Sequence, residues 1–259
     1  MRVIHDPKEL PQHGCNFVPT MGALHEGHCE LIKCANQNCD DVIVSIFVNP
    51  TQFAPNEDFS AYPRTFDKDV ELAKSSGANI VFAPTIEVVY EKEMEDIPLP
   101  TVATEPKLED AIRPTHFQGV CNVVARLFDF TNPAKAFFGE KDYQQLKVIE
   151  SMTRQDSRWS SLEIVAVPTA RDIDGVALSS RNAYLSQEER EQARAISRSL
   201  TVGCENGMKV ILEEAGLDVD YAVIRDAYSL LAPVEGRPRR AIVAARAGST
   251  RLIDNGALP

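Results

Sequence analysis

A predicted strand, a glycine-containing turn and the start of a helix follow one another directly near the N-terminus of the chain. Phe17 and Val18 form a short apolar run that continues into Pro19 and Gly22. Residues 28–35 then place His, Leu, Ile and Ala at i, i+3, i+4 and i+7, which is the spacing of one helix face. This order predicts a strand whose end lies close to a helix N-terminus.

Two histidines, His25 and His28, lie at this junction with Gly27 between them. A helix N-terminus offers unpaired N–H groups and a partial positive charge, which suit a phosphate. A single histidine on an apolar face is more often a packed core residue, and the zinc-protease pattern His-Glu-x-x-His has different spacing. The pair in its context resembles the His-x-Gly-His signature of the nucleotidylyl-transferase superfamily, whose histidines stabilise a triphosphate during attack at the α-phosphorus.

Further apolar runs predict the strands of a parallel sheet. The run Val42–Val48 is nearly all β-branched, which is typical of a strand buried on both faces. Three more strands are expected at Ile80–Ala83, Lys135–Phe138 and Leu162–Val167, with a short one possible at Val3 and Ile4. Helices are expected over residues 65–76, 120–130 and 143–153, and an irregular stretch over 91–111. Because ligands of open parallel sheets bind beyond the carboxyl ends of the strands, the site is expected at that edge.

The pattern changes after about residue 169. Asp172–Gly175 reads as a turn, and Ser186–Glu189 is a capping box that opens a polar helix reaching Leu200. A second helix is expected within Leu217–Leu231, and a terminal hairpin within Ala241–Asp254. We therefore expect an α/β fold, with a Rossmann-like parallel-sheet domain at 1–168, a smaller α+β domain at 169–259 and the site in the cleft between them.

Composition limits the possible partners. Hydrophobic residues make up 44% of the 259 residues and charged residues 25%, as in ordinary globular proteins. A net charge of −11 argues against nucleic acid as a partner and requires a phosphate site to gather its positive charge locally. No signal peptide or membrane-length apolar run is present, so a cytoplasmic protein without membrane contact is expected. Six cysteines lack C-x-x-C spacing and indicate neither a zinc ribbon nor a disulfide framework: Cys15, Cys29, Cys34, Cys39, Cys121 and Cys204.

Polar groups follow several of the predicted strands. Side-chain amides at Asn49 and Gln52 can both donate to and accept from a small polar substrate. The turn Gly139–Asp142 carries Lys141, which suits a polyphosphate, and Gln145 follows it. The loop Ala177–Asn182 offers two hydroxyls and a guanidinium for gripping a triphosphate. Arg113 and His116 add a cation and an imidazole for an anionic substrate. Each of these motifs also has an ordinary structural interpretation, as a surface lysine or as a solvated turn.

Taken in order, these motifs resemble the pantothenate synthetase (pantoate–β-alanine ligase) family over nearly the whole chain. The shared motifs are Pro19–His28, Phe47–Phe53, Tyr62–Thr65, Phe138–Asp142, Leu178–Asn182 and Thr250–Asn255. The resemblance implies a Rossmann-like ATP domain, a smaller C-terminal lid domain and a homodimer. It also implies that pantoate and ATP give pantoyl adenylate and pyrophosphate, and that β-alanine then displaces AMP to form pantothenate for coenzyme A synthesis.

The resemblance also implies roles for individual residues. His28 and His25, with Lys141 and Arg181, would be catalytic, Gln52 would hold pantoate and then β-alanine, and Gln145 would hold pantoate, with Asn49 nearby. ATP-binding residues would be Met21, Gly22, Ala23, Leu24, His25, Glu26, Gly27, His28, Gly139, Glu140, Lys141, Asp142, Ala170, Leu178, Ser179, Ser180 and Arg181.

The chain also departs from the family pattern. Thr115 stands where glycine is common, and Lys68 stands in a stretch, Phe66–Asp69, that is often more acidic and can help to hold magnesium. No protein metal ligand is therefore expected, and Mg²⁺ should arrive with ATP as substrate.

Two other functions fit part of the pattern. Another adenylyl-transfer enzyme of the superfamily would share both histidines but would not be expected to carry Gln52 together with Gln145. A non-catalytic nucleotide-sensing protein on the same fold would need fewer cations than His25, His28, Lys141 and Arg181 supply.

Overall fold

The chain separates into two compact units. The computed structural model describes residues 1–259 except 12, 38–40, 55–58, 61, 91–94 and 259. The first unit comprises Met1–Gly139 and Val148–Val167, and the second comprises Glu140–Lys147 and the chain from Pro168 onward. The C-terminal part of the second unit begins at Pro168, one residue before the expected start at residue 169. It also includes Glu140–Lys147, which the predicted division leaves in the first part.

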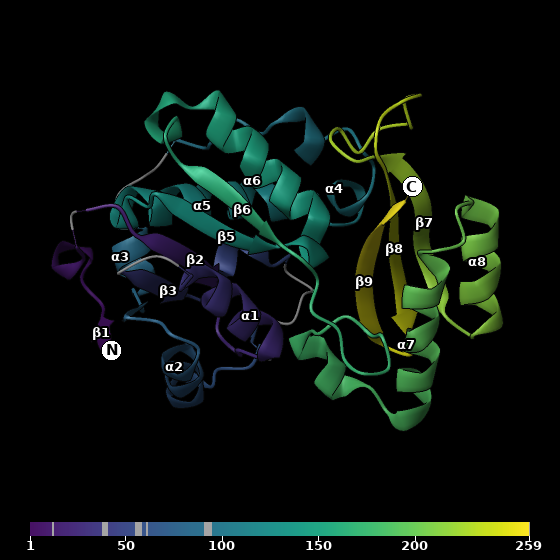
Figure 1. The fold of residues 1–259 in the computed structure, drawn as a ribbon, viewed down its shortest axis with the longest axis horizontal. Coiled ribbons are helices and arrows are strands. Elements are labelled where there is room, and N and C mark those ends of the chain that lie inside the picture. The colour runs from purple at the N-terminus through teal and green to yellow at the C-terminus, as the bar shows by residue number, and fades with distance from the viewer. Residues whose placement is uncertain (12, 38–40, 55–58, 61, 91–94, 259) are drawn as a thin grey trace. The chain divides into compact units, whose positions relative to one another are not determined.

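A six-stranded parallel sheet forms the centre of the first unit (Figure 1). The strand order is β1-β4-β3-β2-β5-β6, and every pairing is parallel. The strands are β1 (Arg2–Ile4), β2 (Asn16–Thr20), β3 (Val42–Ile46), β4 (Ile80–Phe82), β5 (Lys135–Gly139) and β6 (Glu163–Val167). This sheet confirms the predicted Rossmann-like architecture, and Val3 and Ile4, for which a strand was one of two alternatives, lie in β1.

Helices cover both faces of this sheet. Val18 of β2 packs in one cluster with Ile32 of α1 (Glu26–Ala35). The ring of Phe17 lies instead against Phe128 of α5 (His116–Thr131), with the ring centroids 6.2 Å apart. Because successive residues of a strand point to opposite faces, α1 and α5 pack on opposite sides of the sheet (Figure 1). Burial on both sides explains the nearly continuous apolar run of β3.

The other helices follow the expected order with small shifts. The predicted helices over 65–76 and 143–153 are α2 (Phe66–Ser75) and α6 (Tyr143–Gln155), whereas α5 begins four residues before its predicted start. The stretch 91–111 contains only short helical turns in its described part, and residues 91–94 lie outside the described residues. Short helices are α3 (Ile86–Val89), α4 (Glu109–Ile112), η1 (Pro7–Glu9), η2 (Pro50–Gln52), η3 (Thr101–Ala103), η4 (Glu140–Asp142), η5 (Ser157–Trp159) and η6 (Ser180–Tyr184).

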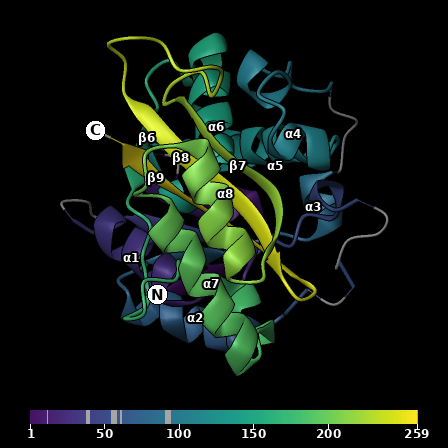
Figure 2. The same cartoon turned by 90° about the vertical axis from the view of Figure 1, so that its right-hand side faces the viewer.

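The second unit is built on a three-stranded antiparallel sheet with strand order β7-β8-β9. Its strands are β7 (Asp218–Asp226), β8 (Arg239–Ala247) and β9 (Thr250–Leu258). Helices α7 (Gln187–Ser199) and α8 (Glu205–Glu214) lie over one face of this sheet (Figure 2). The predicted capping box opens α7, since Ser186 and Glu189 each accept the other's backbone N–H. The predicted terminal hairpin is β8 and β9.

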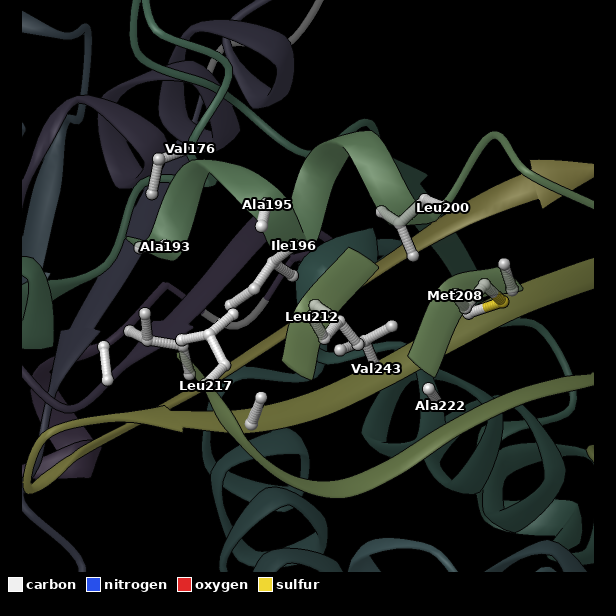
Figure 3. Packing of buried hydrophobic residues seen from close by; sticks show 14 of the residues in the cluster. Val176, Ala193, Ala195, Ile196, Leu200, Met208, Leu212, Leu217, Ala222 and Val243 are labelled. Carbon is white, nitrogen blue, oxygen red and sulfur yellow. The ribbon is translucent and has the colours of Figure 1, made fainter. Parts of the chain in front are cut away.

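An apolar core joins these helices to the sheet (Figure 3). Met208 and Leu212 lie one turn apart on α8 and are fully buried against the sheet residues Ala222 and Val243. Ile196 of α7 joins the same cluster. The helices are thus held by their apolar faces, as expected of amphipathic helices on one side of a sheet.

The helix predicted within Leu217–Leu231 is wrong. Residues Asp218–Asp226 form β7, along which Ala222, Ile224 and Asp226 are buried while Val223 and Arg225 between them are half-buried. This two-residue period is that of a strand. The apolar residues of 217–231 fit both the helix period and the strand period. Pairing with β8 favours the strand. The missing helix is α8, which lies earlier in the chain.

Each helix of the described residues is too short or too polar to span a bilayer. The cysteines that can be described are free thiols, namely Cys15, Cys29, Cys34, Cys121 and Cys204, and Cys39 lies outside the described residues.

Candidate active site

The carboxyl ends of the parallel strands bring two predicted motifs of the first unit to one edge of its sheet. Thr20 of β2 lies beside Ile46 of β3. Met21–His28 leaves the sheet after the first of these strands, and Asn49–Gln52 leaves it after the second. The sheet therefore places both motifs at the edge where α/β proteins bind ligands.

The turn before α1 adopts a left-handed conformation at two successive residues, with φ of +81° at Gly22 and +51° at Ala23. Such a conformation is costly for alanine. The carboxylate of Asp69, which is buried, holds the turn by accepting the backbone N–H of Ala23 at 2.9 Å and that of Leu24 at 2.8 Å. Thr65 donates its hydroxyl to the same carboxylate at 3.0 Å. Asp69 therefore fixes how the chain enters α1.

The two histidines form a reciprocal cap at the start of α1. His25 is the N-cap residue, and its Nδ1 accepts the backbone N–H of Gly27 at 3.1 Å. The Nδ1 of His28 accepts the backbone N–H of His25 at 3.3 Å, and the ring centroids lie 4.2 Å apart. An Nδ1 that accepts a hydrogen bond carries no proton, so each neutral ring is assigned as the tautomer that donates from Nε2. In this tautomer each ring carries its proton on Nε2, and an N–H group of this kind suits a phosphate oxygen.

Asn49 is buried, and its side-chain amide is held by the protein on both ends. Its Oδ1 accepts the Tyr90 hydroxyl at 2.6 Å and the backbone N–H of Thr51 at 3.2 Å. Its Nδ2 donates to Gln52 Oε1 and to the Gly119 carbonyl, both at 3.1 Å. This geometry supports a positioning role for Asn49, and its predicted contact with substrate stays a prediction.

Gln52 is oriented by its neighbours. Its Oε1 faces the Asn49 donor, so the side chain offers its Nε2 donors to a ligand. Its backbone carbonyl accepts from Arg113 Nη2 at 3.3 Å and lies 3.1 Å from His116 Nδ1. The two residues expected to bind an anionic substrate therefore also hold the turn that carries Gln52.

A glycine in α5 allows this turn to approach the helix closely. A Cβ added at Gly119 would collide with the carbonyl oxygen of Thr51 and lie only 2.9 Å from the backbone nitrogen of Gln52. A real Cβ does not approach backbone atoms so closely, so only glycine fits at this position. The close approach brings the Asn49 amide within reach of the helix backbone.

The predicted phosphate-binding residues of the second unit lie on two loops. Lys141 is half-buried in η4, and its Nζ lies 3.7 Å from the Asp142 carboxylate. The second loop contains Ser179, whose hydroxyl accepts the backbone N–H of Arg181 at 3.3 Å at the start of η6. The Leu178 N–H donates to the Ala170 carbonyl at 2.9 Å, which brings two predicted ATP-binding residues together.

Two polar side-chain atoms near the second loop are buried without a partner among the described residues. Within the described part of the chain, Asn182 Oδ1 and Thr169 Oγ1 are buried and have no hydrogen-bond partner. Buried polar atoms are nearly always paired in folded proteins.

The predicted site residues divide between the two units. The first unit holds Met21–His28, Asn49, Gln52 and Gly139, and the second holds Glu140–Asp142, Gln145, Ala170 and Leu178–Arg181. The convergence of His25 and His28 with Lys141 and Arg181 around one nucleotide therefore stays a prediction.

Among the described residues, no group of three or more His, Cys, Asp or Glu side chains is placed to hold an ion. Asp69, in the stretch that is often acidic, directs its carboxylate to backbone N–H groups of the turn before α1.

Several residues that shape the site were not predicted. Asp69 and Tyr90 reach their partners across 46 and 41 residues of sequence, and no local pattern marks such a contact. Gly119 lies one residue before the predicted helix 120–130 but inside α5, and a glycine next to a helical pattern is a signal for close packing that could have been used.

Relatives of this chain are found among known proteins. A family model described as pantoate-beta-alanine ligase matches residues 2–257. A pantothenate synthetase from Nocardia farcinica is 47% identical over 253 residues, covering 92% of this chain and 77% of the relative. One from Rubrobacter xylanophilus is 46% identical over 270 residues, with coverage of 94% and 90%.

Solved structures give the same result. The pantothenate synthetase from Thermus thermophilus superposes with a TM-score of 0.91 at 39% identity, covering 99% of both chains. The pantoate-beta-alanine ligase from Francisella tularensis has a TM-score of 0.84 at 33% identity and covers 99% of this chain and 97% of its own. That protein was solved in complex with beta-gamma ATP and β-alanine.

Proposed function

Because the chain belongs to the pantoate–β-alanine ligase family, we propose that it joins these two substrates through an adenylate intermediate. A carboxylate oxygen of pantoate attacks the α-phosphorus of ATP, and the bond to the β-phosphate oxygen breaks to release pyrophosphate. The amine of β-alanine then attacks the acyl carbon of pantoyl adenylate. The acyl–oxygen bond breaks, AMP leaves, and the amine loses a proton to water.

The observation that carries this proposal is the paired imidazoles at the N-terminus of α1. Their Nδ1 atoms accept backbone N–H groups, so in each neutral ring the N–H group that would meet a phosphate oxygen is Nε2–H. Attack of one anion on another needs positioning and charge neutralisation, and a helix N-terminus with two fixed donors supplies both. His28 would stabilise the negative charge that develops as pyrophosphate leaves, and His25 would lie beside it.

The second unit would supply the formal positive charge. Lys141 and Arg181 would bind the phosphates, and the hydroxyls of Ser179 and Ser180 would donate to them. Guanidinium and ammonium groups suit a triphosphate because its charge increases at the leaving pyrophosphate. We expect Mg²⁺ to arrive on the phosphates of ATP, whose charge it would partly neutralise.

The pantoate site would involve the two glutamines. The Nε2 donors of Gln52 suit a carboxylate or hydroxyl oxygen, and Gln145 would contact pantoate from α6. After pyrophosphate leaves, Gln52 would meet β-alanine. The homodimer and the cytoplasmic location stay expectations from the resemblance and the sequence.

ATP–pyrophosphate exchange tests the two steps separately. We expect exchange of labelled pyrophosphate into ATP that requires pantoate and does not require β-alanine. Addition of β-alanine should then release AMP and pantothenate in equal amounts. Pantothenate formation without pantoate-dependent exchange would contradict the adenylate intermediate, and the absence of any ligation by folded protein would contradict the function.

A further inference from the structure

Two adjacent polar residues of β9, Asp254 and Asn255, are almost fully buried, with 3% and 2% of their surface exposed. Burying a charged and a polar side chain is costly unless each finds partners. Both residues lie in the terminal motif Thr250–Asn255, for which the proposed mechanism gives no role. The partners of these side chains indicate what the motif does.

Asn255 holds the loop that carries Lys141. Its Nδ2 donates to the backbone carbonyls of Glu140 at 2.8 Å and Lys141 at 2.9 Å. Its Oδ1 accepts from Arg240 Nε at 2.6 Å. One carboxamide is thus fixed at both ends and holds two successive carbonyls of η4.

Arg240 of β8 binds the same loop. Its Nη2 donates to the Glu140 carboxylate at 2.9 Å, and its guanidinium lies 3.7 Å from the centre of the Tyr143 ring. Glu140 is therefore bound through its backbone by Asn255 and through its side chain by Arg240. Glu140, the carbonyl of Lys141 and the Tyr143 ring are thus held, while the long side chain of Lys141 extends from a fixed backbone.

Asp254 holds the other loop through Arg171. The two carboxylate oxygens accept from Arg171 Nη1 at 2.6 Å and Nη2 at 2.9 Å. Arg171 forms a β-bridge with Ala177 and also donates to the Gly175 carbonyl at 3.1 Å. This short hairpin leads directly into Leu178–Arg181. Asp254 therefore fixes the segment that precedes that motif.

We propose that Asp254 and Asn255 are positioning residues, which hold the Lys141 loop and the Leu178–Arg181 loop in place from two neighbouring positions of one strand. The proposal rests on the proposed function, since it assigns both loops to the nucleotide phosphates. A lysine side chain has a flexible stem, so its ammonium group is placed well only if its backbone is fixed. A misplacement of about 1 Å at a catalytic group can cost about 10²-fold in rate.

The proposed positioning of Lys141 by Asn255 is tested with the variants Asn255→Ala and Lys141→Ala, singly and together. We expect Asn255→Ala to lower kcat of pantoate-dependent exchange by about 10²-fold in the wild-type background. In the Lys141→Ala background it should lower kcat less than about twofold, because the group that it positions is gone. Asn206→Ala, at an exposed position of α8, is the matched control and should leave exchange unchanged.

The assignment of one residue to each loop is tested by amide hydrogen exchange, which does not depend on activity. Asn255→Ala should speed exchange over residues 140–143 and leave 171–178 unchanged. Asp254→Asn should do the reverse and lower kcat by about tenfold. Asp220→Asn is its matched control, because Asp220 pairs with Arg251 and Arg246 on the same sheet. Asp220→Asn should leave amide exchange unchanged in both loops.

The outcomes separate this proposal from the function that it rests on. If wild-type protein shows no pantoate-dependent exchange, the proposed function fails whatever the variants do. If wild type is active and Asn255→Ala slows it equally with and without Lys141, the loss is general and the positioning role is wrong. Faster amide exchange throughout the unit, or at neither loop, would overturn the assignment in the same way.

Discussion

The imidazole rings of His25 and His28 are oriented by backbone N–H groups of their own helix. The cap explains why both histidines precede or begin α1, since only there are backbone donors unpaired. The same cap places the proton of each neutral ring on Nε2.

Replacing His28 by alanine removes one of these donors. We expect pantoate-dependent exchange to fall by about 10²- to 10³-fold, as is typical when one donor to developing negative charge is lost. His13→Ala is the control, because His13 is exposed and pairs with Asp41. Exchange at the wild-type rate in folded His28→Ala would remove this ring from the mechanism.

Tyr90 acts on the substrate site through Asn49. Burial raises the pKa of the Tyr90 hydroxyl, so it remains a neutral donor to Asn49 Oδ1 near pH 7. We expect Tyr90→Phe to lower kcat/KM for pantoate by about 2- to 10-fold, the usual effect of one hydrogen bond, with little change in KM for ATP. Tyr228→Phe, at an exposed position, should change neither constant. A larger effect on ATP than on pantoate would contradict this role.

At the scale of secondary-structure elements, packing between η2 and α5 depends on Gly119. A methyl group there would collide with the Thr51 carbonyl, and backbone atoms cannot move aside cheaply. We expect Gly119→Ala to lower the free energy of unfolding by about 1–3 kcal/mol and to weaken pantoate binding. Urea unfolding measures the first effect. Gly256→Ala, whose new methyl group would meet Leu200 at an ordinary 3.4 Å, should change stability by much less.

The sequence predicted the elements best where one period dominates. The parallel strands and α7 were found because β-branched runs and a capping box are local signals. β7 was missed because its apolar residues fit two periods and only its pairing with β8 chooses between them. The same reason limits the site: the histidine signature lies in one short stretch, whereas Asp69, Tyr90 and Asn255 act across more than 40 residues.

At the scale of the whole molecule, part of the stability depends on pH through Asp174. Its carboxylate accepts from Arg190 Nε at 2.7 Å, and this hydrogen bond holds the pKa of Asp174 below its ordinary value. The contribution is therefore complete above the unfolded-state pKa of about 3.9 and is lost as pH falls through the lower folded-state pKa.

Replacing the partner of Asp174 tests this dependence. Arg190→Gln should lower the free energy of unfolding similarly at pH 7 and pH 5, and by less near pH 3. Urea titrations at the three pH values measure it. Arg154→Gln, which breaks an exposed i,i+4 pair with Glu150, should have a small effect throughout. An equal loss for Arg190→Gln at pH 7 and pH 3 would show that the Asp174 carboxylate is not involved.

The grouping of Glu140–Lys147 with the second unit has a consequence for dissecting the enzyme. A cut between Val167 and Pro168 looks natural in the sequence, yet the C-terminal fragment would lack the carbonyls that Asn255 holds and the carboxylate that Arg240 binds. Neither fragment should therefore reproduce its half of the native protein in isolation. Co-expressed fragments would have to reassemble through the strand-to-loop contacts, which makes this chain a natural candidate for a split-protein complementation assay.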